Sequence, residues 1–224
     1  LSLHDSKEPK KYLGDKKVWD VAEGILKEIV DEKGADYVEG VGEAAFYGPK
    51  LDFITKDSLG RDWQVATIQL DMNLPERFDL NCIAEDGKPE RIVMIHAAIM
   101  GSIERFLAIL IEHHAGAFPL WLSPVQVIVA PVSQKFMAGA EELARAFVVQ
   151  NIRTQVDGSD ETVGNKVRKA AQQKIPYIIV VGERELAGEA LTVRVRGVEK
   201  QEKMTRAEFA ARLKKEIQER LIAP

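Results

Sequence analysis

The sequence predicts two domains of different class, an α+β domain built on an antiparallel sheet and then an α/β domain with a mostly parallel mixed sheet. Two alternating segments, LDFIT and WQVATIQLDM, flank the turn SLGRD, which is the pattern of an antiparallel hairpin. The segment GAFPLWLSP, with its prolines and glycine, then separates two apolar regions. Beyond it, apolar strands alternate with helices, as in parallel sheets. We therefore expect domains at 1–118 and 124–224, joined by a linker at 119–123.

The first domain has a recognisable order of elements. After a polar loop over 1–16, helical spacing predicts a helix over 17–34. The hairpin follows, and then a loop with a turn at Asp86-Gly87. We expect a short buried strand over 92–96 and a buried helix over 98–114.

The second domain alternates between the two kinds of element. Strands are predicted in VQVIVAPVS, IRTQVDGS, IPYIIVVGERE and ALTVRVRG. Helices are predicted in MAGAEELARAFVVQN, TVGNKVRKAAQQK and TRAEFAARLKKEIQERL, the last with Thr205 as its N-cap.

Composition excludes several classes of protein. Of the 224 residues, 46% are hydrophobic and 29% charged, which is ordinary for a globular protein. The net charge of -4 argues against binding of nucleic acid by bulk charge, although it leaves room for a local basic face. Cys82 is the single cysteine, so no disulfide framework or cysteine zinc cluster is expected within the chain, and a reducing cytoplasm is the simplest compartment.

The sequence also lacks a targeting pattern. No apolar run reaches the roughly 18 residues of a membrane span, so no membrane partner is expected. The first residues are polar, without the apolar core of a signal peptide. They also lack an initiator Met, and we interpret the chain as the interior of a longer one.

Arg105, in HAAIMGSIERF, stands one step from a row of apolar residues and therefore needs a partner or a pocket. It could form a salt bridge with Glu104 or Glu112, or extend to solvent. It could instead bind phosphate, because the guanidinium fork suits phosphate oxygens. Small residues one helical turn earlier, Gly101 and Ser102, would let a flat ligand approach the backbone.

His96 and the two hairpin segments offer further polar side chains. A lone histidine is usually a hydrogen-bonded core residue, and as a zinc ligand His96 would need two or three more protein ligands. Tyr47 and Lys50 flank a Gly-Pro turn that either enters the hairpin or lines a ligand pocket. Strict alternation puts Gln64 on one face of its strand and Thr67 and Gln69 on the other. A solvated sheet face and a polar floor for a small hydroxylated ligand explain that face equally well.

Taken together, FYGPKLDF, WQVATIQLD, IHAAIMGSIERF and AGAFPLWLSPVQV resemble the threonyl-tRNA synthetase family of class II aminoacyl-tRNA synthetases in their order and spacing. The resemblance covers essentially the whole chain. It implies the end of a class II catalytic domain, with the helix of the third class motif, followed by an anticodon-binding domain. The implied activity is ATP-dependent attachment of L-threonine to tRNA(Thr) in the cytoplasm, by an enzyme that is a homodimer at full length.

The resemblance also implies roles for particular residues. Arg105 corresponds to the catalytic arginine on the ATP phosphates, which Mg²⁺ accompanies. His96 corresponds to one of three protein ligands of a Zn²⁺ ion that holds threonine. The remaining implied residues are Gln64, Gly101 and Ser102 at ATP, Tyr47, Lys50, Thr67 and Gln69 at threonine, and Asp160, Arg168, Glu185 and Arg194 at the anticodon. Without the resemblance, Arg194 and Arg196 would be interpreted as a strand pair on a solvated face.

The sequence departs from the family pattern at several positions. Ala97 follows the zinc histidine where the family has arginine, Val65 and Ala66 replace Cys-Gly, and Asp160 stands where asparagine is frequent. The other two zinc ligands and the first two class motifs would precede Leu1, so we expect this chain to be inactive alone. A non-catalytic tRNA-binding paralogue or fragment is the alternative.

Overall fold

The computed structural model describes residues 1–188 and 190–222, and the chain divides into two compact units, Leu1–Leu110 and Ile111–Pro224. The division between Leu110 and Ile111 falls within a single helix. The predicted domain limits of 1–118 and 124–224 remain predictions.

The first unit is built on a five-stranded sheet of order β2-β1-β3-β4-β7, antiparallel except for the pairing of β1 with β2. Its elements are β1 (Ser2–Leu3), η1 (Pro9–Lys11), α1 (Lys16–Glu32), β2 (Gly40–Val41), β3 (Lys50–Lys56), β4 (Asp62–Asp71), α2 (Asn73–Arg77), β5 (Asn81–Ile83), β6 (Pro89–Arg91), β7 (Met94–Ala98) and α3 (Ile103–His113). The α+β class expected for this part is confirmed.

The predicted hairpin is confirmed as β3 and β4, because alternating residues give each strand two distinct faces. Asp57 closes the turn between them by accepting hydrogen bonds from the backbone N–H groups of Leu59 and Arg61, both at 2.9 Å. The predicted helix is confirmed as α1, which Asp15 caps through the N–H of Lys17. It buries Trp19, Ala22, Leu26 and Val30.

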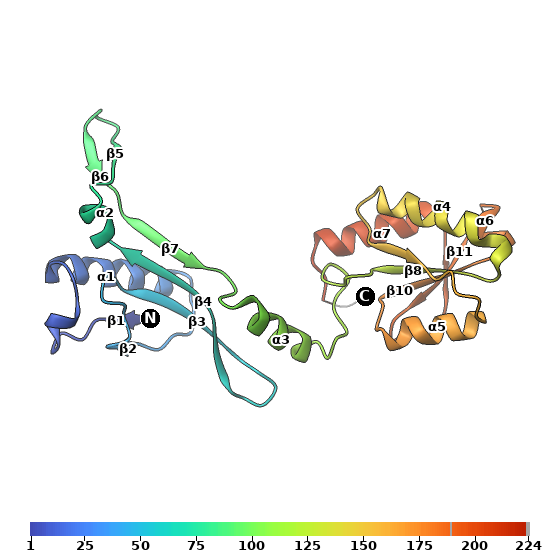
Figure 1. Cartoon of the computed structure of the whole chain (residues 1–224), viewed down its shortest axis with the longest axis horizontal. Coiled ribbons are helices and arrows are strands. Elements are labelled where there is room, and N and C mark those ends of the chain that lie inside the picture. Colours follow the sequence, from blue (N-terminus) through green and yellow to red (C-terminus); the bar gives the residue numbers. More distant parts are fainter. Residues whose placement is uncertain (189, 223–224) are drawn as a thin grey trace. The chain divides into compact units, whose positions relative to one another are not determined.

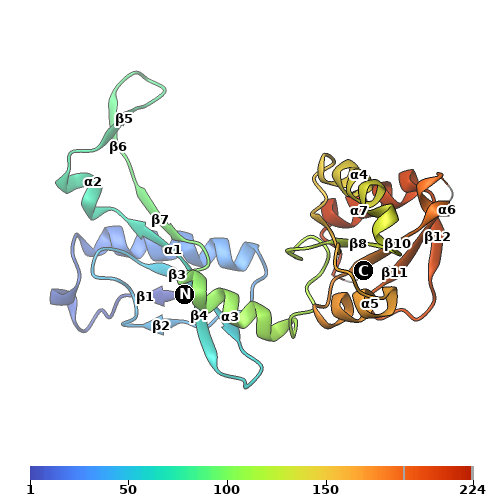
Figure 2. The ribbon, with the colours of Figure 1, turned by 45° about the vertical axis from the view of Figure 1, so that its right-hand side comes forward.

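Two segments differ from the sequence prediction. The predicted loop after β4 contains α2 and an antiparallel hairpin of β5 and β6, which extends beyond the sheet (Figures 1 and 2) and turns at Asp86-Gly87 as expected. The predicted buried helix over 98–114 begins only at Ile103, and none of its residues is buried. The strand expected to be buried over 92–96 is β7, whose residues are half-buried or exposed, so the expectation of burial is wrong for both elements. Met100 and Gly101 both have positive φ, 65° and 52°, which ends the strand and breaks helical geometry before Ser102.

The second unit is a five-stranded mixed sheet of order β12-β11-β10-β8-β9, in which β9, β8 and β10 are parallel. Its elements are β8 (Val127–Pro131), η2 (Gln134–Phe136), α4 (Met137–Val148), β9 (Thr154–Val156), α5 (Val163–Gln172), β10 (Tyr177–Val181), α6 (Glu183–Leu186), β11 (Leu191–Val195), β12 (Glu202–Met204) and α7 (Arg206–Gln218). The α/β class is confirmed, and Thr205 caps α7 as predicted.

Helices cover both faces of this sheet. The main core lies under α4 and α7 and includes Phe147, Tyr177 and Phe209. A smaller cluster, including Ile128, Ala170 and Ile178, lies under α5 on the other face (Figure 1). The sheet is therefore the middle layer of this unit, with helices packed on each of its faces.

Residues 118–126 are fixed to the second unit by side chains that donate to main-chain carbonyls. Arg196 Nη2 donates to Phe118 O at 2.8 Å, and Arg153 donates to Trp121 O and Ser123 O at 2.8 and 2.9 Å. Gln126 Nε2 donates to Leu120 O at 2.9 Å, and the Leu120 side chain belongs to the main core. Residues 119–123 are thus ordered against the second unit.

Candidate functional site

A row of polar side chains crosses three neighbouring strands of the first unit. The register places Lys50 of β3 opposite Gln69 of β4, and Gln69 opposite His96 of β7. Thr67 lies opposite Asp52 in the next row on the same face. Because directly opposed residues share a face of the sheet, the structure brings Lys50, Thr67, Gln69 and His96 together on one face.

Gln64 also lies on this face, and the prediction that it faces away from Thr67 is wrong. The ladder shifts between Phe53 and Ile54, so Ile54 pairs with Gln64 while Phe53 pairs with Ala66. Such a β-bulge adds one residue to a strand and resets its alternation. Gln64 Nε2 and Thr67 Oγ1 both donate to the same oxygen of Asp52, each at 2.7 Å.

Asp52 joins several of the predicted site residues. Its Oδ1 accepts from Gln64 and Thr67, while Oδ2 accepts from Ser2 Oγ at 2.9 Å and pairs with the Lys50 ammonium. Burial raises the pKa of this carboxyl, but the hydrogen bonds from Lys50, Thr67 and Ser2 outweigh it, and the pKa lies below its ordinary value. Asp52 is therefore ionised at neutral pH.

Tyr47 and His96 meet at the other end of the row. Tyr47 Oη donates to Gln69 Oε1 at 2.8 Å, and the Tyr47 and His96 rings lie edge to face with centroids 5.7 Å apart. His96 Nε2 lies 2.9 Å from Oδ2 of Asp71, whose side chain is fully buried. Asp71 Oδ1 accepts from the N–H groups of Asn73 and Leu74, so Asp71 ties His96 to the start of α2.

The surroundings of His96 fit one ligand of a metal site, and no more. Its Nδ1 has no hydrogen-bond partner among the described residues, while Nε2 is held by a buried carboxylate. This carboxylate–imidazole arrangement is common behind metal-bound histidines. No group of three or more His, Cys, Asp or Glu side chains within residues 1–188 and 190–222 could hold a metal ion. His96 is therefore a candidate for a single ligand, and a complete metal site would need further ligands from outside residues 1–188 and 190–222.

A cavity of about 650 Å³ opens beside this row, which is within the range of small-molecule sites. The sheet contributes Lys50, Asp52 and Gln64 to its wall. The remaining lining residues are Leu1, Ser2, Asp36, Tyr37, Val38, Gly40, Glu43 and Ile54. Its position beside the polar row makes it a candidate ligand cavity.

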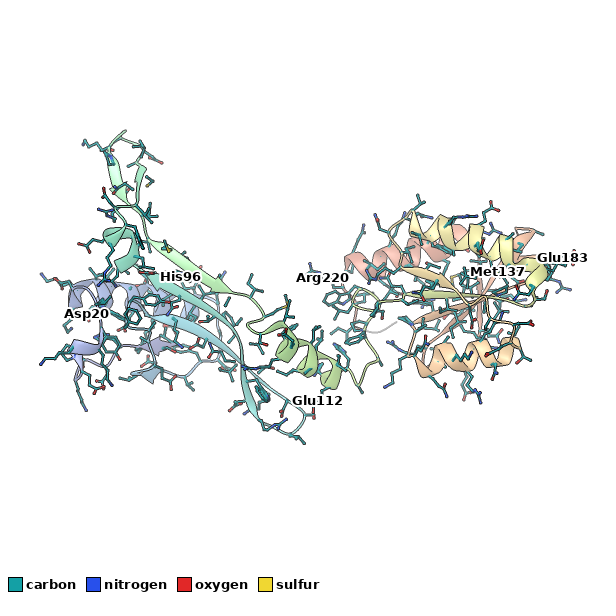
Figure 3. All side chains as sticks on the ribbon, in the orientation of Figure 1. Asp20, His96, Glu112, Met137, Glu183 and Arg220 are labelled. Atoms are coloured by element: carbon teal, nitrogen blue, oxygen red, sulfur yellow. The ribbon has the colours of Figure 1, made fainter. Side chains whose placement is uncertain are left out.

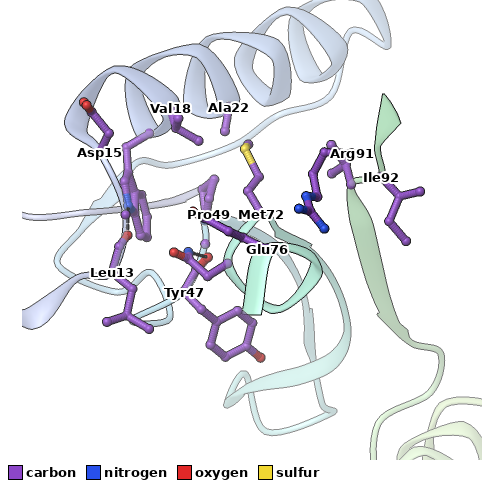
Figure 4. Close-up of a pocket in the computed structure, with 15 residues that line it drawn as sticks. Leu13, Asp15, Val18, Ala22, Tyr47, Pro49, Met72, Glu76, Arg91 and Ile92 are labelled. Carbon is purple, nitrogen blue, oxygen red and sulfur yellow. Dashed lines mark hydrogen bonds between the residues drawn. The ribbon is translucent and has the colours of Figure 1, made fainter. Parts of the chain in front are cut away.

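A second hollow, of about 360 Å³, lies between α1 and the segments around Met72 and Ile92 (Figure 4). Its lining is mostly apolar and includes Trp19 and Val93. Tyr47 is the single predicted site residue that borders it. The cavity of about 650 Å³, which is lined by Lys50, Asp52 and Gln64, is therefore the better candidate for the ligand site.

Arg105 stands on the first turn of α3, after the turn at Gly101 and Ser102. A Cβ added to Gly101 would lie 3.3 Å from the Val65 carbonyl oxygen, so this turn passes close to the bulged part of β4. Ser102 O accepts the N–H of Phe106 at 3.0 Å, and its hydroxyl donates to Glu104 at 3.0 Å. Gly101 and Ser102 thus precede the helix rather than belonging to its previous turn.

The Arg105 guanidinium rests against an aromatic ring. It lies over the Trp63 ring, 5.3 Å from the ring centroid. Glu104, one of the two alternatives considered, bonds to Ser102 instead. A cation on an aromatic face keeps its charge available to an anion.

Sequence reasoning missed two carboxylates, Asp52 and Asp57, and a tryptophan, Trp63. Asp52 and Asp71 orient the residues of the polar row, as described above. Trp63 Nε1 donates to Asp57 Oδ2 at 2.9 Å. That hydrogen bond, with those from the Arg61 and Leu59 backbones and the Arg61 side chain, holds the pKa of Asp57 well below its ordinary value despite the desolvation of the carboxyl. Period-two alternation from Lys50 would have found Asp52.

The predicted anticodon residues lie around α5, α6 and β11 of the second unit. Arg194 pairs with Ile178, so it shares the α5 face of the sheet, and its buried Nε has no hydrogen-bond partner in the described part of the chain. Glu185 accepts from Gly182 N at 3.0 Å and from Thr192 Oγ1 at 3.1 Å, which places it near Arg194. Asp160 and Arg168 are exposed, before and on α5.

Arg196 differs from the solvated arrangement expected without the resemblance. Burial lowers its pKa, and Nη1 donates to Lys174 O at 2.7 Å while Nη2 holds Phe118 O. Arg194 is likewise only partly exposed. Neither arginine is a simple solvated surface residue.

No helix within residues 1–188 and 190–222 is both long and apolar enough to cross a membrane. Figure 3 draws the side chains of the described residues and labels His96, which lies on β7.

Comparison with known proteins agrees with the two-part architecture. Residues 6–114 match the family model of the tRNA synthetase class II core domain (G, H, P, S and T), and residues 126–216 match that of the anticodon binding domain. Threonine–tRNA ligase of Porphyromonas gingivalis is 48% identical over 223 residues, and that of Carboxydothermus hydrogenoformans is 46% identical over 215. These matches cover 100% and 96% of this chain but 34% of each relative, so the chain spans about a third of the length of the curated relatives.

A solved structure is similar over nearly the whole chain. The RNA binding domain of threonyl-tRNA synthetase from Cryptosporidium parvum Iowa II superimposes with a TM-score of 0.83 at 36% identity. The match covers 96% of this chain and 54% of the other.

Proposed function

The chain belongs to the threonyl-tRNA synthetase family of class II aminoacyl-tRNA synthetases, and on that basis we propose that it supplies part of a threonine–tRNA ligase. The proposed enzyme activates L-threonine with ATP and transfers it to tRNA(Thr). Residues 1–118 would form the end of its catalytic domain and residues 124–224 its anticodon-binding domain. The observation that carries this proposal is the convergence of Lys50, Gln64, Thr67, Gln69 and His96 on one sheet face. Tyr47 joins them through its hydrogen bond to Gln69, and Lys50 and Gln64 also line the neighbouring cavity.

In the activation step, the threonine carboxylate attacks the α-phosphorus of ATP and pyrophosphate leaves. Arg105 would bind phosphate oxygens through its guanidinium, together with Mg²⁺, because a cation that rests on an aromatic face keeps its charge available to an anion. Gln64, Gly101 and Ser102 would border ATP. The chain's contribution is thus mainly positioning and charge stabilisation.

The threonine end would lie between Tyr47, Lys50, Thr67 and Gln69. His96 would be one ligand of a Zn²⁺ ion, with Asp71 fixing its ring. When bound, zinc would hold the amino and hydroxyl groups of threonine. A site that requires a hydroxyl rejects valine far better than an apolar pocket can.

The second domain would read the anticodon of tRNA(Thr). Asp160, Arg168, Glu185 and Arg194 are the residues proposed for this role. Carboxylates and guanidiniums suit the edges of unstacked bases, and the unpartnered Nε of Arg194 supports it as a donor. We further propose a cytoplasmic homodimer at full length.

Threonine-dependent exchange of pyrophosphate into ATP tests the catalytic proposal. The complete polypeptide should catalyse it, this chain alone should not, and Arg105→Ala should abolish it in the complete polypeptide. Exchange by the isolated chain would show that its own residues complete the site. No exchange by the complete polypeptide would overturn the proposed activity.

Ala97 favours a second candidate function. It follows His96 on β7 where the family has arginine, so a non-catalytic tRNA-binding paralogue is the alternative. Such a protein would bind tRNA(Thr) without catalysing exchange.

A further inference from the structure

We infer that Asp52 is a positioning residue for the proposed activation of threonine, an inference that rests on the proposed function. Asp52 is not among the site residues that the family resemblance implies. Its carboxylate nevertheless contacts three of them, which come from two strands and are assigned to both ATP and threonine.

The hydrogen bonds of Asp52 explain why it would orient other side chains rather than bind the substrate itself. An ionised carboxylate offers about four acceptor sites. Gln64 and Thr67 occupy Oδ1, and Ser2 and Lys50 occupy Oδ2. All four sites are therefore filled by protein donors, and no free lone pair faces the cavity.

The contacts also fix the direction of flexible side chains before a ligand arrives. Lys50 and Gln64 have long side chains on the cavity wall, and each would otherwise sample several rotamers. Asp52 is itself only 11% exposed as a side chain, and it stands opposite Thr67 in the β3–β4 ladder. Because the sheet holds this carboxylate in place, Asp52 can fix the orientation of side chains on both sides of the bulge.

The bulge makes this arrangement possible. With strict alternation Gln64 would point to the opposite face, and its amide could not reach Asp52. The extra residue in β4 turns Gln64 back toward the carboxylate, at 2.7 Å. Asp52 therefore links the proposed ATP side of the site, through Gln64, to the proposed threonine side, through Lys50 and Thr67.

Replacing Asp52 by asparagine tests the inference. Asp52→Asn keeps the shape but removes the charge, and its amide nitrogen would face a donor. We expect KM for both ATP and threonine to rise about tenfold or more in pyrophosphate exchange by the complete polypeptide. Asp52→Glu keeps the charge but displaces it, so we expect a smaller rise in the same two constants.

Asp62→Asn is the matched control, because Asp62 is an exposed carboxylate of β4 that pairs with Lys56 at 2.6 Å outside the cavity. It should leave both KM values unchanged. A purely structural role for Asp52 would lower the amount of active enzyme, and so the apparent kcat, without moving either KM. Unchanged KM values in Asp52→Asn, or in Asp52→Glu if the asparagine variant does not fold, would overturn the inference while the proposed function stands. Absence of exchange in the unsubstituted polypeptide would overturn both.

Discussion

The guanidinium of Arg105 lies over the indole of Trp63, 5.3 Å from the ring centroid, although the two residues stand on different elements. Arg61 lies over the same ring at 5.6 Å, and Asp57 holds the indole N–H. The β3–β4 turn thus fixes a surface on which the proposed phosphate-binding arginine rests.

Trp63→Leu should weaken ATP binding roughly two- to fivefold, because an exposed cation–π contact contributes about 0.5–1 kcal/mol. KM for ATP in pyrophosphate exchange by the complete polypeptide measures this, and KM for threonine should change less. Trp63→Phe keeps an aromatic face, so its KM for ATP should lie between those of the wild type and Trp63→Leu. A leucine variant with wild-type KM for ATP would show that the ring does not orient Arg105.

Asp71→Asn should lower the zinc affinity of the complete polypeptide about 10- to 100-fold, as for other outer-shell partners of metal ligands. Asparagine can still accept the N–H groups of Asn73 and Leu74, so α2 should keep its start. Its amide would donate to His96 Nε2 and favour a proton on Nδ1, the nitrogen left for a metal. Metal analysis after dialysis against a zinc buffer, with Asp62→Asn as control, measures the loss. Full zinc content in Asp71→Asn would mean that His96 does not depend on Asp71.

Arg194→Ala should weaken binding to tRNA(Thr) by about 1–3 kcal/mol and reduce discrimination against a changed middle anticodon base. Binding must be compared at one salt concentration, because phosphate contacts would otherwise mask base reading. Lys214→Ala, on α7 over the opposite face of the sheet, is the control. If the unsubstituted chain binds both tRNAs equally, the second domain does not read that base.

Tyr177→Phe should lower the free energy of unfolding of the second unit by about 1–3 kcal/mol at neutral pH, because the buried Glu216 carboxylate loses its bond from the phenol. Burial first, and then Glu216, raise the pKa of Tyr177 above its ordinary value of 10.0. The unfolded state therefore loses this proton first as pH rises, so the stabilisation is complete below about pH 10 and declines progressively as the pH rises from there toward the higher pKa of the folded state.

Urea unfolding between pH 8 and 11 checks this. The difference in unfolding free energy between the wild type and Tyr177→Phe should be constant up to about pH 9 and shrink above pH 10. A difference that stays constant throughout would show that the phenol is not stabilised in its neutral form.

Local patterns predicted most of the strands and helices, because alternation and helical spacing follow directly from which face is buried. The start of α3 was missed because the run from Ala97 to Gly101 contains no polar side chain to mark a boundary, and the positive φ values of Met100 and Gly101 separate strand from helix. The predicted face of Gln64 was wrong because a β-bulge depends on how the strand pairs with its partner. The alternation of residues within one strand does not reveal that pairing. The contact of Arg105 with Trp63 joins residues far apart in sequence, so no local pattern contains it.

The anchoring of residues 118–126 has a practical consequence for domain dissection. A recombinant fragment begun at residue 124 would remove Leu120, which is 1% exposed, and leave a hole in the main core. It would also remove the carbonyls of Trp121 and Ser123 that accept from Arg153, and the Phe118 carbonyl that accepts from Arg196. A fragment begun before Phe118 keeps both, and is the one to clone when the second unit is wanted alone.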